Sequence, residues 1–249
     1  METHRRNQYL GAIGIDVWVP RSSGVSQALE APLPAPGTGA SGPAFPASPG
    51  SVPLSVPLSP ELSADWEKLR AEVSACTRCA LHATRTQGVL GVGNRQADWL
   101  IIGEAPGAEE DRRGEPFVGR AGQLLDAMLR AIGLSRETNV YIANVLKSRP
   151  PGNRDPKPNE VAACLPYLMR QIALMRPRLI LAVGRIAAQN LLSTDVPLGR
   201  LRGKIHPFGE LNTPLIVTYH PAYLLRTPAD KRKAWDDLKF ARGVFRQLT

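Results

Sequence analysis

The chain has 249 residues, which is enough for one well-buried domain with additional segments. Its formal net charge is +9, but residues 1–62 carry only three basic and four acidic side chains. Residues 63–249 therefore hold 28 basic against 18 acidic side chains, a net charge of +10. A positive excess confined to one part of the chain favours a polyanionic partner such as nucleic acid. The alternative is that the basic surface only keeps the protein soluble and has no such partner.

Cysteine number and hydropathy argue against a secreted or membrane-spanning protein. Three cysteines do not make the even-numbered framework of a disulfide-rich secreted domain. No stretch approaches the roughly 18–20 apolar residues of a membrane span, and the first twenty residues lack the apolar core of a signal peptide. We therefore expect a cytoplasmic protein without membrane contact, in a reducing compartment where free thiolates favour a metal or a cluster.

The amino-terminal quarter of the chain differs from the rest in composition. Residues 21–60 include nine prolines, eight serines and five glycines, which predicts a disordered linker over 21–62. Before it, residues 1–20 contain the apolar patch "YLGAIGIDVWV", which is typical of a docking peptide that binds a replication or repair protein. It resembles the amino-terminal peptide of the psi subunit of the bacterial polymerase III clamp loader. A strand or helix packed back on the domain is the other interpretation.

From residue 63 onward, short apolar segments alternate with helical patterns. The isoleucine- and valine-rich segments at 98–103, 139–144, 179–184 and 214–220 predict buried strands of a parallel sheet. Helical periodicity covers 121–133, 159–175, 186–192 and 231–248. This alternation predicts an α/β fold, in which a parallel sheet of four strands lies between two layers of helices, in one domain over 63–249.

Three of the four predicted strands end in loops rich in Gly, Pro and polar residues. They are "GEAPGAEEDRRGEPFVGRAG" after the first, "NVLKSRPPGNRDP" at the end of the second and "HPAYLLR" after the fourth. Ligands of open parallel sheets bind beyond the carboxyl ends of the strands. We therefore expect these loops to surround one pocket, whereas "GRIAAQN" after the third strand is interpreted as structural.

Four motifs in chain order carry a resemblance to a known family. The segments "CTRC" (76–79), 103–122, 144–164 and 220–226 resemble those of the type 4 uracil-DNA glycosylases, the iron–sulfur members of the uracil-DNA glycosylase superfamily. The likeness runs over roughly residues 66–248. It implies a three-layer α/β/α sandwich with a four-stranded parallel sheet, in agreement with the strand pattern.

The resemblance implies roles for three residues of the predicted pocket. Such an enzyme flips the nucleotide into a pocket and reads its Watson–Crick edge, and Asn144 can donate to uracil O4 and accept from N3–H. Phe117 matches the aromatic residue that stacks on the flipped base. His220 matches the residue that donates to uracil O2 as negative charge develops there. The alternative for each residue is a purely structural role: Asn144 in a turn, Phe117 in the core and His220 at the end of a strand.

The residue that positions the water nucleophile is left open. The better-known branch of the superfamily has an aspartate where this chain has Ala105, which we place beside the base. Glu104 is the first candidate for holding the water and Glu110, also placed at the base, is the second. Alternatively, an oxocarbenium-like sugar needs no carboxylate, and Glu104 ties the backbone of a tight turn.

The motif after His220 and several basic residues are predicted to contact DNA. Leu224 and Leu225 are candidates for apolar wedges that help to extrude the base, and Arg226 for a phosphate contact. Further candidates for neutralising the DNA backbone are Lys147, Arg149, Arg154, Arg200, Arg202 and Lys204.

The cysteines match three of the four ligands with which the family holds a [4Fe–4S] cluster. Cys76 and Cys79 correspond to the first pair and Cys164 to the last ligand, while Ser148 stands at the remaining position. A serine hydroxyl is a poor ligand for iron compared with a thiolate. We favour a cluster that is held by three thiolates, with serine or water on the fourth iron. The alternatives are a three-iron cluster, no cluster, or zinc with His82 as an added ligand.

The sequence therefore predicts a monomeric, nucleoid-associated enzyme of bacterial type. Its expected reaction is that of a monofunctional DNA glycosylase, which hydrolyses the N-glycosidic bond of uracil and initiates base excision repair. A catalytically weakened module that binds uracil-containing DNA is the second hypothesis. A nucleotide-cofactor or redox protein is disfavoured, because no G-x-G-x-x-G follows the first strand.

Overall fold

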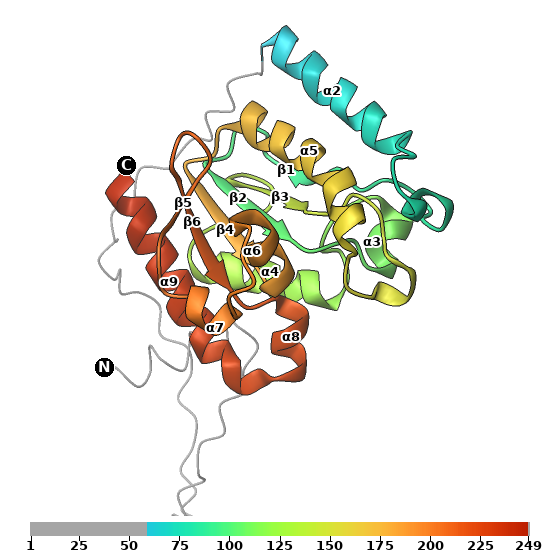
Figure 1. Cartoon of the computed structure of the whole chain (residues 1–249). Helices are drawn as coiled ribbons and strands as arrows, with labels where there is room; N and C mark the ends of the chain where they lie inside the picture. Colours follow the sequence, from blue (N-terminus) through green and yellow to red (C-terminus); the bar gives the residue numbers. More distant parts are fainter. Residues whose placement is uncertain (1–58, 249) are drawn as a thin grey trace, which may run out of the picture.

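A computed structural model describes residues 59–248 (Figure 1). The predicted docking peptide and nearly all of the predicted linker lie outside these residues. The first helix, α2 (Pro60–Ser74), begins at a proline, and Ser59 caps it by accepting a hydrogen bond from the N–H of Leu62. The helix therefore starts three residues before the predicted beginning of the domain at residue 63.

The central sheet has the strand order β1-β3-β2-β4-β6-β5. Its four inner strands are the predicted ones and run parallel, but an antiparallel strand is added at each edge. The prediction of four strands was thus incomplete, because strands of two and three residues leave no alternation to detect. The strands are β1 (Val92–Gly93), β2 (Trp99–Gly103), β3 (Val140–Asn144), β4 (Leu179–Val183), β5 (His206–Phe208) and β6 (Thr213–Thr218).

Helices follow the strands as the periodicity predicted. The four predicted helical segments are confirmed as α4, α5, α6 and α9, each within one or two residues of its expected ends. Apart from α2, the remaining helices are short and lie in the connections. The α-helices after α2 are α3 (Ala108–Arg113), α4 (Arg120–Ala131), α5 (Pro158–Met175), α6 (Arg185–Leu192), α7 (Leu198–Leu201), α8 (Pro221–Arg226) and α9 (Lys231–Leu248), and the 3₁₀ turns are Ala80–Ala83, Pro151–Asn153 and Pro228–Asp230.

Two apolar cores hold the three layers together. Because side chains alternate along a strand, Leu100 and Ile102 of β2 face one core, with α2, α5 and α6, while Trp99 and Ile101 face the other, with α4, α8 and α9. All five residues of β2 are buried. The predicted α/β/α sandwich is therefore confirmed (Figure 1). Over the described part of the chain, no helix is both long and apolar enough to cross a membrane.

The topology places a crevice at the carboxyl ends of the parallel strands. The chain leaves β2 toward α4 on one face and leaves β3 toward α5 on the other, so the two connections diverge. Gly103 and Asn144, the last residues of β2 and β3, are paired neighbours in the sheet. Ligands of doubly wound sheets bind at such a divergence.

Candidate active site

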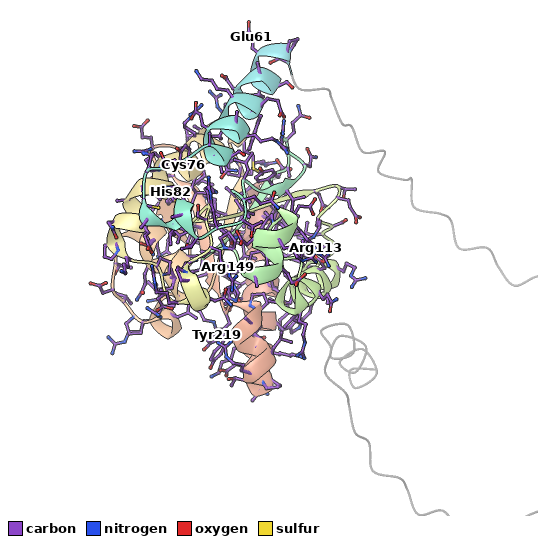
Figure 2. All side chains as sticks on the ribbon, turned by 90° about the vertical axis from the view of Figure 1, so that its right-hand side faces the viewer. Glu61, Cys76, His82, Arg113, Arg149 and Tyr219 are labelled. Carbon is purple, nitrogen blue, oxygen red and sulfur yellow. The ribbon has the colours of Figure 1, made fainter. Side chains whose placement is uncertain are left out.

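A cavity of about 400 Å³ lies beyond the ends of the parallel strands. The three predicted loops meet there, since it is lined from the β2–α4 connection, the loop after β3 and the segment that opens α8. Figure 2 views the molecule from the right-hand side of Figure 1, with Arg113, Arg149 and Tyr219 labelled on these three parts. The lining residues include Glu104, Ala105, Glu110, Phe117, Asn144, Asp155, His220, Tyr223 and Arg226.

Asn144 presents a free hydrogen-bond acceptor to this cavity. The residue is 2% exposed, and its buried Oδ1 has no hydrogen-bond partner among residues 59–248. The main-chain carbonyl of Asn144 instead accepts a hydrogen bond from Nζ of Lys147 over 2.7 Å. Buried polar atoms without partners are rare in native proteins. A ligand that donates an N–H at this point would satisfy the atom.

Phe117 forms one wall of the cavity and has an unusual backbone. Its φ is +56°, in the left-handed region that a phenylalanine seldom adopts. Its ring is 5.5 Å from that of His220, with an angle of 31° between the planes. A Cβ atom on Gly103 would lie 2.6 Å from Cζ of Phe117 and 2.4 Å from Oδ1 of Asn144. Only a glycine at this position leaves both side chains where they are.

His220 is held as a neutral imidazole with a defined tautomer. The main-chain N–H of Ala222 donates to its Nδ1 over 3.1 Å, so the ring proton is on Nε2. Burial, followed by the nearby charge of Arg226, lowers the pKa of His220 to about 4, while the charge of Glu110 acts in the opposite direction. At neutral pH the residue is therefore a neutral hydrogen-bond donor.

A buried polar network fixes the end of β6, from which His220 follows. Asp237 on α9 accepts two hydrogen bonds from Arg202 and one from the hydroxyl of Thr218, the last residue of β6. The guanidinium of Arg202 also lies over the ring of Tyr219, 4.5 Å from its centroid. The guanidinium of Arg202 is paired with Asp237 and stacked on Tyr219. It is therefore not free to bind a DNA phosphate, contrary to the prediction.

Glu104 is a half-buried carboxyl group at the junction of two loops. Burial, and then the charge of Asp155, raise the pKa of Glu104 to about 7, while Arg185 opposes the shift. Asp155 and Arg185 form an ion pair of 2.6 Å with each other. A carboxyl group with a pKa near 7 in a cavity is suited to take up a proton at neutral pH. Glu104 thus lines the cavity for which the sequence named it as the first candidate to hold the water.

Glu110, in contrast, is engaged by the backbone. Its Oε1 accepts hydrogen bonds from the N–H groups of Val118 and Gly119, over 3.1 and 3.2 Å. Glu110 lines the cavity, as predicted, but its carboxylate holds the loop that carries Phe117. Ala105 also lines the cavity and offers no polar group to a water molecule.

The predicted wedge residues separate into one buried and one exposed leucine. Leu224 is 1% exposed and packs in the core with α4 and α9, which corrects its prediction as a wedge. Leu225 is 37% exposed, and Arg226 is exposed and lines the cavity. The helical turn of α8 explains the difference, since adjacent residues of a helix point in different directions.

Two further basic residues that were predicted to contact DNA have partners within the protein. Lys147 is buried, and its Nζ donates to Asn144, Gln171 and the carbonyl of Leu90. Burial lowers the pKa of Lys147 to about 7, partly offset by Cys164. Arg154 forms a two-fold hydrogen-bonded ion pair with Glu160.

The three cysteines share one corner of the molecule. Cys164 on α5 is buried, and Cys76 and Cys79, in the segment after α2, pack against the same core. Burial raises the pKa of the Cys164 thiol, and the main-chain N–H of Lys147 donates to its sulfur over 3.4 Å. Lys147 lowers the pKa of this thiol, while the charges of Cys79 and Cys76 raise it.

The fourth ligand position has a different partner. Ser148 is 4% exposed, and its Oγ accepts a hydrogen bond of 2.9 Å from Arg85. The same guanidinium donates to the carbonyls of Ser74 and Cys76. Cys76, Cys79 and Cys164 are the residues whose thiolates would hold a cluster at this corner. The hydroxyl of Ser148 does not fit the fourth position as a thiolate would.

The zinc alternative finds no support. Among residues 59–248, no three His, Cys, Asp or Glu side chains are grouped so that they could hold a single metal ion. His82 points its Nδ1 at the carbonyl of Cys79, 2.8 Å away, and remains exposed. Cys76 and His82 are labelled in Figure 2 on the segment after α2.

Sequence reasoning did not assign roles to three residues that contribute to these sites. Tyr223 and Asp155 line the cavity, although both lie in motifs that the sequence singled out. Arg85 binds the carbonyl groups and Ser148 beside the cysteines, and nothing in its sequence context distinguishes it from a surface arginine.

Comparison with known proteins agrees with this geometry. A family model described as "Uracil DNA glycosylase superfamily" matches residues 90–239. The type-4 uracil-DNA glycosylase of Archaeoglobus fulgidus is 47% identical over 174 residues, which cover 68% of this chain and 87% of that protein. Those of Pyrobaculum aerophilum and Thermotoga maritima are 43% and 40% identical, over 74% and 73% of this chain and 97% and 95% of theirs.

Proposed function

The chain belongs to the uracil-DNA glycosylase superfamily, among its type-4 members, and from this premise we propose how its residues release uracil from DNA. The protein is a uracil-DNA glycosylase, a hydrolase of N-glycosidic bonds whose reaction initiates base excision repair. The observation that carries the proposed mechanism is the buried, unpartnered Oδ1 of Asn144 in the wall of the cavity.

Asn144 recognises the flipped base by its Watson–Crick edge. Its Oδ1 accepts the N3–H of uracil, and its amide group donates to O4. Cytosine has an acceptor at N3 and a donor at C4, so both pairs would be mismatched at a cost of about 1–3 kcal/mol each. The hydrogen bond from Nζ of Lys147 to the main-chain carbonyl of Asn144 holds this residue in place while its side chain binds the base.

Phe117 stacks on the base and His220 assists the departure of uracil. When the bond between C1′ and N1 breaks, its electron pair moves onto the uracil ring and the sugar becomes positively charged. Nε2–H of His220 donates to O2, where part of the negative charge accumulates. Since the imidazole is neutral above pH 4, it acts through a hydrogen bond and need not transfer its proton.

Glu104 positions the water molecule that attacks C1′. Its deprotonated carboxylate accepts a hydrogen bond from the water and takes its proton as the new C–O bond forms. The raised pKa of Glu104 supports this role, because a base with a pKa near 7 is half deprotonated at neutral pH. Ala105 offers no competing carboxylate.

DNA is held next to the cavity by α8. The exposed Leu225 enters the base stack at the position that the flipped nucleotide leaves. Arg226, at the rim of the cavity, contacts a phosphate. The positive charge of residues 63–249 adds a contribution that does not depend on sequence.

The cysteine corner holds an iron–sulfur cluster through Cys76, Cys79 and Cys164. When bound, a [4Fe–4S] cluster would add a covalent link between the segment after α2 and helix α5. Its part in the reaction is structural, since the loop after β3 leads from Asn144 to this corner. The packing of all three cysteines against the same apolar core supports the proposal.

Two further proposals concern the whole protein in the cell. Residues 1–20 act as a docking peptide for a replication or repair protein, and the protein works as a cytoplasmic, nucleoid-associated monomer. Support for the peptide comes from the sequence alone, since it lies outside the described residues. Pull-down with a synthetic peptide of residues 1–20, against one with its apolar patch replaced by serine, tests it.

Single-turnover release of uracil from a labelled oligonucleotide tests the mechanism. We expect release by the wild type, and a loss of about 100-fold or more in Asn144→Ala and in His220→Ala. Asn190→Ala is a control, because its side chain bonds only within α6. Rates at the wild-type level in both variants would place the chemistry elsewhere. Binding of the oligonucleotide without release would indicate a binding module instead of an enzyme.

A further inference from the structure

Two charged side chains form hydrogen bonds with the backbone on either side of Phe117 in the sequence. On one side, Glu110 accepts the N–H groups of Val118 and Gly119. On the other, the guanidinium of Arg136 donates to the carbonyls of Pro116 and Phe117, over 3.1 and 2.7 Å. Both the donors and the acceptors of this short segment are therefore bound by charged side chains.

These hydrogen bonds stabilise a backbone conformation of Phe117 that is unfavourable by itself. Phe117 has a φ of +56°, which a residue with a β-carbon adopts only when the surroundings enforce it. Helix α4 also approaches closely, since a Cβ atom on Gly122 would lie 1.7 Å from the carbonyl oxygen of Phe117. Strained backbone of this kind is found at sites where a side chain must be held in one position.

The side chain of Arg136 is held in place by a further ion pair, and it does not reach the base cavity. Its Nε donates to Asp126 of α4 over 2.9 Å, and the side chain is only 17% exposed. The turn that carries it is closed at Ser135, whose N–H donates to Oδ1 of Asn139. Arg136 lines a surface cleft of about 240 Å³ and does not line the base cavity. It can affect the base only through the residues it holds.

We propose that Arg136 is a positioning residue for uracil excision, which holds Phe117 in the conformation that stacks on the flipped base. The inference rests on the proposed function of the cavity and adds a residue to it. A planar guanidinium suits the task, because it donates to two adjacent carbonyls and a carboxylate at once. Lysine has one ammonium group and cannot span the three acceptors in the same way.

A double-mutant cycle between Arg136 and Phe117 tests this proposal. The variants are Arg136→Met, which keeps an unbranched apolar side chain but removes the guanidinium donors, Phe117→Ala, and the two combined. Each is measured for single-turnover uracil release and for inhibition by free uracil, which reports on the base pocket without DNA. Arg130→Met is the matched control, as Arg130 lies at the same cleft but is exposed and bonds only to the carbonyl of Asp126.

We expect Arg136→Met to slow release by about tenfold and to weaken inhibition by uracil, which is what a partial loss of base stacking produces. In the Phe117→Ala background the same change should have less than about a twofold effect, because residues that act as a unit are not additive. Arg136→Lys should restore part of the loss, and Arg130→Met should match the wild type.

Multiplicative effects of Arg136→Met and Phe117→Ala would overturn the proposal, as would wild-type release and inhibition in Arg136→Met. If Arg136→Met does not fold, as judged by circular dichroism, Arg136→Lys carries the same cycle. A wild-type protein that releases no uracil would instead contradict the proposed function, so the two failures are distinguishable.

Discussion

The main-chain N–H of Ala222 donates a hydrogen bond to Nδ1 of His220, and this bond decides which ring nitrogen can serve the base. With Nδ1 occupied, the neutral ring presents Nε2–H as its donor. The bond forms because Pro221 starts α8 directly after His220, which becomes the N-cap residue. A motif of two residues, His-Pro, thus fixes both the tautomer and the beginning of the helix.

The pH dependence of the excision rate in the neutral range should come from the titration of Glu104 and not from that of His220. The pKa of His220 is lowered to about 4, so its charge state does not change between pH 5 and 9. The pKa of Glu104 is raised to about 7. We expect single-turnover release to rise with pH through a midpoint near 7, and Glu104→Gln to be slower and without this midpoint. The same midpoint in the variant would exclude Glu104 as the base.

Glu104→Gln should also change how stability depends on pH. The folded protein binds the proton of Glu104 more tightly than the unfolded chain does, because the pKa is raised from its ordinary value. The resulting stabilisation is complete below the unfolded pKa, near 4.5, and is lost as pH rises through about 7. The melting temperature of Glu104→Gln relative to wild type should therefore be higher at pH 8 than at pH 4. An unchanged difference would contradict the burial of this carboxyl group.

Gly103→Ala should abolish the pocket while keeping the fold. The added Cβ would meet Oδ1 of Asn144 at 2.4 Å and Cζ of Phe117 at 2.6 Å, so both must move. Since a displacement of about 1 Å in an active site can cost 100-fold, we expect at least that loss in single-turnover release. Gly199→Ala is the control, because its Cβ would meet nothing within 4 Å. Wild-type activity in Gly103→Ala would show that Asn144 and Phe117 do not contact the base.

Ser148→Cys should increase the iron content of the purified protein. The substitution supplies a fourth thiol beside Cys76, Cys79 and Cys164, at a position where Arg85 favours a negatively charged partner. Iron per chain and the absorbance near about 400 nm, a range typical of thiolate-bound iron–sulfur centres, measure the effect. Thr86→Cys is the control for an added thiol, because Thr86 follows Arg85 in the chain and its N–H donates to Asp111. Equal iron in wild type and Ser148→Cys would count against this ligand position.

Leu225→Ala should affect double-stranded DNA more than single-stranded DNA. A wedge acts by replacing the extruded base in the stack, and a single strand has less stacking to overcome. We expect release from duplex DNA to fall by about tenfold, with a smaller change on a single strand. Leu211→Ala, which alters a leucine that is 75% exposed, is the control. Equal losses on both substrates would indicate a role other than insertion.

The pocket could be located from the sequence because its loops follow strands. Gly103, Asn144 and His220 come directly at or after the ends of apolar segments, and parallel strands bring their carboxyl ends together. The family resemblance then implied a stacking role for Phe117, and it left Glu104 as the first of several candidates for holding the water. The edge strands could not be predicted, since Val92–Gly93 is too short to show any alternation.

Burial and pairing, in contrast, could not be derived for single residues. Leu224 and Leu225 are chemically identical in the sequence, yet only Leu225 is exposed, because α8 turns Leu224 toward the core. Lys147 and Arg202 look like surface charges but are held by Asn144 and Asp237. Arg136 contacts Phe117 across 19 positions of the chain, and a contact of that kind leaves no local pattern.

The amino-acid sequence by itself determined the layered α/β fold, the position of the pocket and several of the side chains that line it. These follow from local hydrophobic periodicity and from motifs whose residues are close together in the chain. The tertiary structure alone decided the tautomer of His220, the proton affinity of Glu104, the free acceptor of Asn144 and the strained backbone of Phe117. Each depends on the burial and the partners that distant segments provide, and these exist only once the chain has folded.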